Sequence, residues 1–514
     1  MGRAKGNGMK RFGIFLGYGE HQSIRNEGLG RVFGFIIGGA LEKADVRPTI
    51  ACVAGLRPRV EELLQDHLID VARVDWITTD RLPATEDHAN TPVLESAELS
   101  LVARLRAKRH HAREYAKLRG ARKNLPGYLR MAWGYICYLS WRLLGLPASA
   151  CALFRSTAVP TRLEPLQPLP ESLAPSELEQ LVCHINACED IDAWLIPTLF
   201  WPEASGISRP KIVVCPDIVL HEFPSYFMDP VLQPSYSNLL RCVWMADRLI
   251  CYSQHVKENH AVRTAGFRRE RIEVIRHGKV DLSPQLALEN RQLSMTERRE
   301  VAVESMRVAQ ATAMSHSAYW QEFNFDNTPY VVYTSQARPY KNILSLVKAI
   351  EHLSRRRHQD VRLVLTCNLA NAPELQQYIE DRRLESIVMP LHNISSKTLA
   401  AVNSLATIAV NPSLFEGGFP FTFSEAFSVG TPSLMSRIPV VEEVVTDEAL
   451  RSMMLFDPYD LSSMIERIEW GLTNRQVLFQ QQQELYDSLP TWKDSANRYV
   501  ETLLQRNLTA DGDS

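Results

Sequence analysis

Short apolar runs alternate with amphipathic helical segments along most of this 514-residue chain. Residues 9–55 predict a strand, a glycine loop, a helix and a second strand, which is how a doubly wound sheet begins. Further apolar runs bounded by turn residues predict buried parallel strands. These runs are AWLIP (193–197), KIVVCP (211–216), DRLICYS (247–253) and IEVIRHG (272–278). The first half of the chain is therefore expected to form a parallel α/β domain.

The strand pattern stops between 284 and 328, where a capping box from Ser294 to Glu297 predicts the start of a helix. Strands are predicted again at PYVVYTS (329–335), VRLVLTC (361–367), SIVMPL (386–391) and ATIAVNPS (406–413). We therefore expect two Rossmann-like α/β domains with additional helices. The expected segments are a first domain at 1–283, a helical linker at 284–328, a second domain at 329–490 and, at 491–514, a helix that crosses back to the first domain.

One segment within the first domain departs from the α/β pattern, and we expect a helical insertion at about 80–190. Ten Lys or Arg residues between Arg104 and Arg130 face a single acid, Glu114. The apolar stretch that follows is rich in Trp and Tyr. The whole segment 104–154 is typical of an interfacial anchor on an anionic membrane surface. The alternative is a basic and aromatic insertion that packs on the protein. Glycine and proline interrupt the apolar run, which disfavours a membrane-spanning helix.

Composition narrows the function classes. A formal net charge of −2 disfavours a general nucleic-acid binder, because binding to phosphates needs a basic surplus. The nine cysteines are odd in number and lie mostly in apolar runs, which is typical of reduced thiols in the cytoplasm. Cys183 and Cys188 flank His184, but this spacing without a second pair does not favour a zinc site. The first residues do not resemble a secretory signal.

Two cations follow a predicted strand of the second domain. Arg338 and Lys341 lie on the loop and first helical turn after the run 329–335, outside the carboxyl end of a strand. Open α/β sheets bind ligands at this place. A planar guanidinium and an ammonium there can neutralise a pyrophosphate group.

Two glutamates flank a glycine loop further along the same domain. The loop at Gly417 and Gly418 can bring backbone N–H groups close to a phosphate, and the start of the following helix adds a favourable dipole. Glu425, in the first turns of that helix, can accept hydrogen bonds from a ribose diol. Glu416 lies on the opposite side of the loop, towards the other domain.

These motifs resemble a known enzyme family. NPSLFEGGFPFTFSEAFSVGTP (411–432) and SQARPYKNILSLVKAI (335–350) resemble the carboxyl half of the retaining, nucleotide-sugar-dependent glycosyltransferases of family 4. EGLGRV (27–32) and MADRLICYSQHVKENH (245–260) resemble the amino half. The resemblance covers most of the chain except about 80–190 and 284–327. It implies a GT-B fold, in which two Rossmann-like domains face a cleft, with the donor nucleotide on the second domain and the acceptor on the first.

The resemblance also implies roles for individual residues. Arg338 and Lys341 would bind the donor diphosphate, Glu425 the ribose hydroxyls, and Glu416 the transferred sugar at its reacting side. Other donor-binding positions would be the loop residues Gly417, Gly418 and Phe419, together with Gly28 and Gly30 of the first glycine loop. Ser253 matches a framework position of the first domain, near the acceptor.

The sequence departs from the family pattern in two places. Eight residues separate Glu416 from Glu425, one more than in the usual motif. Pro216 stands where many members carry a histidine at a strand end, while the aspartate that follows, Asp217, remains as a candidate catalytic contact to the acceptor hydroxyl. His221 is a candidate to replace the missing histidine, although a lone histidine is more often structural.

By this resemblance, the chain is expected to transfer a hexose with retention of configuration. GDP-mannose is favoured over a UDP-hexose as donor, and a glycan or lipid-linked glycan of a bacterial cell-surface polysaccharide is the expected acceptor. No Asp-x-Asp pair follows a strand, so neither a metal nor another cofactor is expected. The protein would be cytoplasmic, or peripheral on the inner face of the cytoplasmic membrane. A nucleotide-sugar epimerase or phosphorylase, and a non-catalytic nucleotide-binding scaffold of a polysaccharide assembly complex, remain alternatives.

Overall fold

The structure is a computed structural model that describes residues 10–20, 24, 28–43, 45–80, 176–227, 233–287, 293–311 and 318–505. The basic and aromatic segment 104–154, with its expected membrane contact, lies outside the described residues. Among those described, no helix has both the length and the apolar character needed to cross a bilayer. The seven cysteines within the described part of the chain are free thiols.

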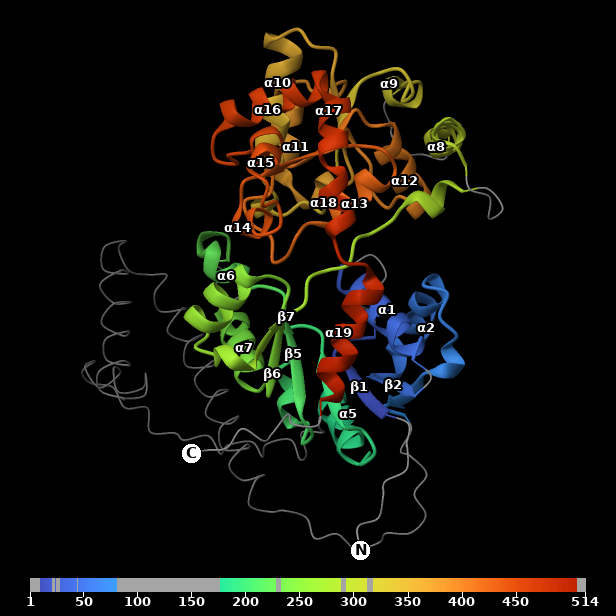
Figure 1. The fold of residues 1–514 in the computed structure, drawn as a ribbon, viewed down its shortest axis with the longest axis vertical. Helices are drawn as coiled ribbons and strands as arrows, with labels where there is room; N and C mark the ends of the chain where they lie inside the picture. Colours follow the sequence, from blue (N-terminus) through green and yellow to red (C-terminus); the bar gives the residue numbers. More distant parts are fainter. Residues whose placement is uncertain are drawn as a thin grey trace, which may run out of the picture. The chain divides into compact units, whose positions relative to one another are not determined.

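The first domain contains a parallel sheet in which the strands run in the order β3-β2-β1-β4-β5-β6-β7. The strands are β1 (Lys10–Leu16), β2 (Val46–Cys52), β3 (Asp75–Thr78), β4 (Ala193–Ile196), β5 (Lys211–Cys215), β6 (Arg248–Cys251) and β7 (Ile272–Val274). The helices are α1 (Gly28–Leu41), α2 (Arg57–Asp66), α5 (Glu177–Asn186), α6 (Val219–Glu222), α7 (Gln233–Trp244) and a π-helix, η6 (Val256–Thr264). Figure 1 shows these elements in blue to green.

The second domain repeats this arrangement with the strand order β10-β9-β8-β11-β12-β13. Its strands are β8 (Tyr330–Tyr333), β9 (Arg362–Leu365), β10 (Val388–Pro390), β11 (Ile408–Asn411), β12 (Ser433–Ser436) and β13 (Leu455–Phe456). Its helices are α8 (Met295–Ala311), α9 (Ala318–Gln321), α10 (Ile343–Arg356), α11 (Pro373–Asp381), α12 (Ser396–Leu405), α13 (Phe421–Ser428), α14 (Pro439–Glu442), α15 (Glu448–Met454), α16 (Leu461–Thr473), α17 (Arg475–Gln481) and α18 (Gln483–Ser488).

The segment expected to be a linker, 284–328, contributes to the core of the second domain. Met306 of α8 and Trp320 of α9 are almost fully buried in one apolar cluster with Tyr330 of β8. Trp320 Nε1 also donates a hydrogen bond to the Glu385 carbonyl at 2.6 Å. A sequence without strand signals therefore packs as a helical cover on one face of the sheet, because its apolar side chains find partners there.

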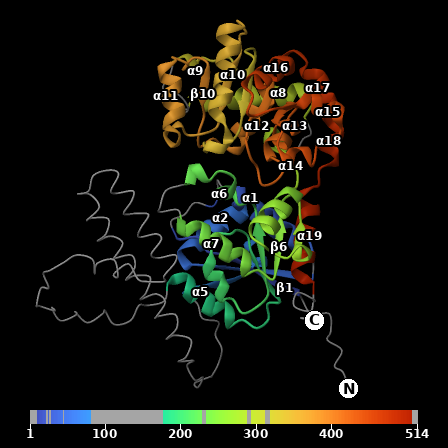
Figure 2. The same ribbon diagram turned by 90° about the vertical axis from the view of Figure 1, so that its left-hand side faces the viewer.

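The last described helix, α19 (Trp492–Leu504), packs mainly against the first domain, and its first residue, Trp492, also contacts Phe421 of the second domain. The rings of Trp492 and Phe35 of α1 stack with centroids 4.3 Å apart. Gly39 of α1 permits this approach, since a Cβ there would lie 2.2 Å from the Cβ of Ala496. Both views show α19, in red, alongside the first sheet (Figure 1, Figure 2).

One sequence-based boundary is wrong. Gly28 and Gly30 were expected in a loop before the first helix, but they form the first turn of α1. A Cβ on Gly30 would lie 2.0 Å from the carbonyl oxygen of Ile24. The absence of a side chain at Gly30 thus lets the incoming chain pass close to the start of the helix.

Candidate functional site

Two loops of the second domain leave its sheet next to each other. One follows β8 and leads to α10, and the other follows β11 and leads to α13. β8 and β11 are hydrogen-bonded neighbours, although two strands separate them in the sequence. Open parallel sheets bind ligands outside the carboxyl ends of the strands where the strand order reverses in this way. The candidate residues Lys341 and Glu416 lie on these two loops.

An ion pair between Lys341 and Glu416 joins the loops. Lys341 Nζ lies 2.6 Å from Glu416 Oε1, with side chains 17% and 16% exposed. Ser413 Oγ donates a hydrogen bond to the same carboxylate oxygen at 2.7 Å. Burial disfavours the ammonium, but the Glu416 carboxylate outweighs it, so the pKa of Lys341 lies above its ordinary value. Lys341 is therefore charged at neutral pH.

Arg338 supplies a second cation at the edge of the same loop. Its Nη1 donates to the Tyr340 hydroxyl at 3.2 Å, and its Nη2 donates to Gln336 Oε1 at 3.1 Å. Its side chain is exposed. These two uncharged partners orient the guanidinium. The pair of cations expected from the sequence thus stands on one loop, with one member held inside and the other at the surface.

Glu425 and Phe419 complete the second-domain wall. Glu425, on α13, is 4% exposed, and Thr334 Oγ1 directly after β8 lies 3.4 Å from its Oε2. The ring of Phe419 packs edge-on against Phe423 with centroids 5.5 Å apart. Glu425 therefore presents a buried carboxylate near the end of β8, while Phe419 anchors the glycine loop to the core through its side chain.

The glycine loop lies against the first domain. A Cβ on Gly417 would lie 2.2 Å from the Pro216 carbonyl oxygen and 3.1 Å from Asp217 Oδ2. Ser253 Oγ, at the end of β6, donates a hydrogen bond to the Gly417 carbonyl at 2.9 Å. Gly418 is similarly close to Tyr252. Ser253, expected as a framework residue of the first domain, thus holds the loop that carries Glu416.

Asp217 follows β5 and faces the charged groups of the second domain. Its Oδ1 accepts a hydrogen bond from the Val219 N–H at 3.0 Å. Burial raises the pKa of Asp217, and the Glu416 carboxylate raises it further, whereas Lys341 and Arg338 lower it. These interactions bring four residues that are far apart in sequence into a single electrostatic cluster.

The remaining sequence candidates occupy other positions. His221 is exposed on α6, four residues after Asp217. Gly28 and Gly30 open α1, which follows β1. Neither glycine carries a side chain that could act on a substrate, so any contribution would come from the backbone at the start of α1.

Comparison with known proteins identifies the second domain. Residues 318–487 match the family described as glycosyl transferases group 1. Arg338, Lys341, Glu416 and Glu425 lie within the matched range, whereas Asp217 lies outside it.

Two curated proteins that match part of this chain are mannosyltransferases. The O-antigen chain mannosyltransferase RfbU of Salmonella typhimurium is 36% identical over 113 residues. The MMP alpha-(1->4)-mannosyltransferase of Mycolicibacterium hassiacum is 31% identical over 132 residues. The alignments cover 22% and 25% of this chain, and 31% of each relative. The chain thus matches less than a third of the length of either relative.

A solved structure is similar over nearly the whole chain. The HepE protein of Anabaena, in complex with UDP and glucose, superposes with a TM-score of 0.54 at 15% identity. The superposition covers 96% of this chain and 99% of HepE. The expected GT-B fold, with two parallel-sheet Rossmann-like domains, is confirmed for the described residues.

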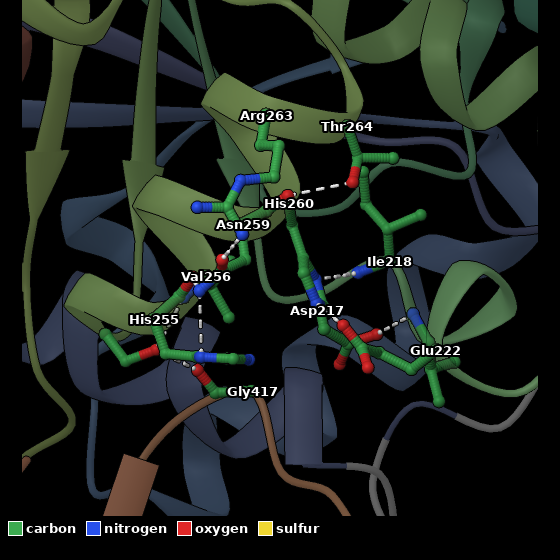
Figure 3. Close-up of polar contacts among 12 residues, drawn as sticks. Asp217, Ile218, Glu222, His255, Val256, Asn259, His260, Arg263, Thr264 and Gly417 are labelled. Carbon is green, nitrogen blue, oxygen red and sulfur yellow. Dashed lines mark hydrogen bonds and ion pairs between the residues drawn. The ribbon is translucent and has the colours of Figure 1, made fainter. Parts of the chain in front are cut away.

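Sequence reasoning missed one cluster next to the glycosyl transferases group 1 domain. Glu222, His255 and His260 bring ligand-type atoms within 4.8 Å of one another. Figure 3 shows these side chains beside Asp217 and Gly417. The segment QHVKENH contains both histidines, but His260 lies on a π-helix that begins directly after His255, and the wider turn of this helix is not visible in the apolar pattern.

Proposed function

We propose that this protein is a retaining family 4 glycosyltransferase that transfers a hexose, with mannose favoured, from a nucleoside-diphosphate sugar to a glycan or lipid-linked glycan. The observation that carries the proposal is the 2.6 Å pair between Lys341 and Glu416 at the strand-order reversal. This pair stands beside a glycine loop and faces Asp217 of the first domain. Sugar transfer requires a cation for the leaving diphosphate, amides for the phosphates and carboxylates on both sides of the site.

Arg338 and Lys341 would stabilise the leaving diphosphate. In the free protein, Glu416 neutralises Lys341. A bound phosphate would compete for the ammonium, which leaves the Glu416 carboxylate available for the sugar. Negative charge develops on the diphosphate as the glycosidic bond to the donor breaks, and preorganised cations stabilise such charge more in the transition state than in the ground state.

Glu425 and the glycine loop would orient the nucleotide. The Glu425 carboxylate is 4% exposed and lies beside Thr334, and carboxylate oxygens are acceptors for ribose hydroxyls. Gly417 and Gly418 offer backbone N–H groups without side chains that would block the approach of a phosphate. Fixing the donor at both ends reduces the entropy that the reaction must lose at the anomeric carbon.

Asp217 would receive the acceptor hydroxyl. Its carboxylate lies on the first-domain side of the site, next to Gly417 and within the field of Glu416. Retention without an enzyme nucleophile fits a front-face displacement. In that route the acceptor oxygen bonds to the anomeric carbon, the carbon–oxygen bond to the diphosphate breaks, and the diphosphate takes the acceptor's proton.

The proposed donor, acceptor and location follow from the relatives and from the basic segment of the sequence. Two mannosyltransferases among the relatives favour mannose, and HepE, a structural neighbour, was solved with UDP and glucose. The basic segment 104–154 supports a lipid-linked glycan of a cell-surface polysaccharide, synthesised by a cytoplasmic enzyme held on the inner face of the membrane. Because Arg338 and Lys341 supply the positive charge, we propose that no metal or other cofactor takes part.

A panel of nucleotide sugars tests the proposal. Purified protein is incubated with GDP-mannose, UDP-glucose or UDP-galactose, with and without lipid-linked glycan, in the presence and absence of EDTA. The expected result is release of nucleoside diphosphate that depends on the acceptor and persists in EDTA. Conversion of a donor without acceptor would favour an epimerase or phosphorylase, and nucleotide binding without turnover would favour a scaffold.

A further inference from the structure

His260 is a buried histidine between the two segments that carry the candidate carboxylates. It lies on η6 with its side chain fully buried. Figure 3 shows its ring next to the segment from Asp217 to Glu222. The sequence comparison with family 4 assigns it no role, and the function proposed above does not use it. Its hydrogen bonds, however, define which of its nitrogens carries the proton.

The two ring nitrogens of His260 have opposite partners. Nδ1 lies 2.7 Å from the backbone nitrogen of Ile218, an N–H donor, so Nδ1 must offer its lone pair. Nε2 lies 2.9 Å from Glu222 Oε1, which accepts a proton. A neutral imidazole with its proton on Nε2 satisfies both contacts. Burial lowers the pKa of His260, although Glu222 opposes this, so the neutral form is favoured.

The face of the same ring contacts the second domain. His260 and Phe415 stack with centroids 5.4 Å apart and planes 16° apart. Phe415 directly precedes Glu416, and Ile218 directly follows Asp217. One imidazole therefore touches the neighbours of both candidate carboxylates, through its edge on the first-domain side and through its face on the second-domain side.

We propose that His260 is a positioning residue that sets Asp217 against Glu416 by holding Ile218 and Glu222 with its edge and Phe415 with its face. The proposal rests on the proposed function, because it assigns Asp217 and Glu416 to sugar transfer. His260 itself does not touch substrate. It acts through the backbone of the short segment between β5 and the end of α6.

The support of η6 makes His260 a rigid reference point. Glu443 Oε2 on the second domain accepts hydrogen bonds from the Gln254 and His255 N–H groups, at 2.8 and 3.2 Å. Inside η6, Thr264 Oγ1 donates to the Asn259 carbonyl at 2.8 Å. This bond satisfies a carbonyl in the wider π-helical turn. The helix is thereby fixed before and after His260.

The same tautomer argues against a metal ion at the cluster of Glu222, His255 and His260. Coordination through His260 Nε2 would move the proton to Nδ1, which faces the Ile218 N–H at 2.7 Å. Two donors would then oppose each other. Metal-binding histidines usually donate their second N–H to a carboxylate, a carbonyl or a water. The geometry thus favours a hydrogen-bonded scaffold over a cation site.

Three substitutions separate the two edge contacts. His260→Asn places an amide oxygen where Nδ1 stands and keeps the Ile218 contact, while His260→Gln keeps only a donor towards Glu222, and His260→Ala keeps neither. Hydrogen–deuterium exchange of the peptide covering 217–222 is expected to remain slow in the wild type and in His260→Asn, and to become fast in the other two. His184→Asn, at a histidine bonded to the Thr78 carbonyl, is the matched control.

Kinetic measurements then distinguish a positioning role of His260 from a purely structural one. His260→Gln is expected to lower kcat roughly 10- to 100-fold, because small displacements of a reacting group have effects of that size. The KM for the nucleotide sugar should stay unchanged, since the proposed diphosphate and ribose contacts Arg338, Lys341 and Glu425 lie on the second domain. Adding Asp217→Asn to His260→Gln should lower kcat no further than Asp217→Asn alone.

Several outcomes would overturn the proposal. One is equal exchange of the 217–222 peptide in His260→Asn and His260→Gln. Another is a kcat loss in the Asp217→Asn, His260→Gln double variant equal to the product of the two single losses. A third is stoichiometric binding of Zn²⁺ that disappears in His255→Ala. If the wild type transfers no sugar, the proposed function fails, but the exchange comparison still decides whether His260 orders the segment. Failure of His260→Ala to fold leaves the Asn and Gln variants to decide.

Discussion

The two walls of the candidate site are built in different ways. On the second domain, Lys341 and Glu416 lie on loops that directly follow adjacent strands, and Glu425 lies on the helix after the second of these loops. All three contact partners on the same domain. On the first domain, Asp217 lies on a segment whose position depends on His260, which is more than forty residues away. The first kind of wall follows from strand topology, whereas the second follows from one long-range hydrogen bond.

Because of this difference, the second-domain wall depends on charged side chains, whereas the first-domain wall depends on the placement of neutral ones. The second-domain wall carries a charged pair with side chains 17% and 16% exposed, and the pair persists because each partner stabilises the other. The first-domain wall depends on histidines that burial keeps neutral. Substitutions that remove charge should therefore damage the second domain most, and acid should damage the first domain first.

The largest expected effect is on the charged wall. Lys341→Ala should lower kcat/KM about 100- to 1000-fold, because one lost contact to developing charge costs about 3 to 4 kcal/mol in the transition state. Transfer from the active nucleotide sugar is the measurement. Lys348→Ala, on the following helix α10 beside Tyr378, is the matched control and should leave transfer unchanged. Wild-type turnover in Lys341→Ala would remove Lys341 from the site.

A smaller effect is expected where the walls meet. Gly417→Ala places a Cβ 2.2 Å from the Pro216 carbonyl oxygen, so the loop must move away from Asp217. We expect a loss of about 1 to 3 kcal/mol in the free energy of unfolding, as for overpacking elsewhere, together with reduced transfer. Urea unfolding followed by circular dichroism measures the first and the transfer assay the second.

Gly38→Ala provides the control for this glycine. A Cβ at Gly38 would stand 3.7 Å from Ile69 Cδ1, an ordinary contact, inside α1. The change should stabilise the protein by up to about 1 kcal/mol, because alanine has the higher helix propensity. If Gly417→Ala were as well tolerated as Gly38→Ala, the two walls would not be in tight contact.

A further effect, which appears only at low pH, concerns acid and the first domain. His277 lies among aromatic rings, 4.0 Å from Tyr252 and 4.6 Å from Phe421 between centroids, and burial lowers its pKa from 6.5 to about 3. The unfolded chain therefore binds a proton that the folded chain does not. The stabilising contribution is complete above about pH 6.5 and is lost as the pH falls towards 3, by at most about 1.4 kcal/mol per unit.

His277→Phe should flatten this dependence. Phenylalanine keeps a ring in the aromatic cluster and cannot be protonated. Thermal unfolding is measured between pH 7 and pH 4, and the difference between wild type and variant isolates His277 from His255 and His260, whose pKa values burial also lowers. Parallel curves for the two proteins would show that His277 does not contribute to acid sensitivity.

The sequence predicts the fold well where periodicity is strong. Apolar runs with turn residues at their ends are typical of buried parallel strands, and the strands found at 193–196 and 408–411 lie inside the expected runs. It predicts less between 284 and 328, because helices that cover a sheet carry the same amphipathic pattern whether they join domains or belong to one. Packing against Tyr330 decides that question, and packing is not visible in one sequence.

The residues of the candidate site also differ in how far the sequence predicts them. Arg338, Lys341, Glu416 and Glu425 could be selected because each follows a strand or opens a helix, so local order defines their place. The cluster around His260 could not be selected from the sequence, since the role of His260 depends on which backbone N–H donates to its Nδ1. The one-residue excess between Glu416 and Glu425 remains compatible with the 2.6 Å contact to Lys341, because the extra length lies in the glycine loop that bends towards Pro216.

The position of α19 has a consequence for biosynthesis. Residues 10–274 leave the ribosome long before residues 492–504 have been translated, and these late residues cover Phe35 and the close-packed face at Gly39. Domains generally fold in the order of their synthesis. Here the earlier domain must wait with an uncovered apolar face while the later domain is made. The apolar face at Phe35 and Gly39 thus stays without its native cover until the last described helix has been made.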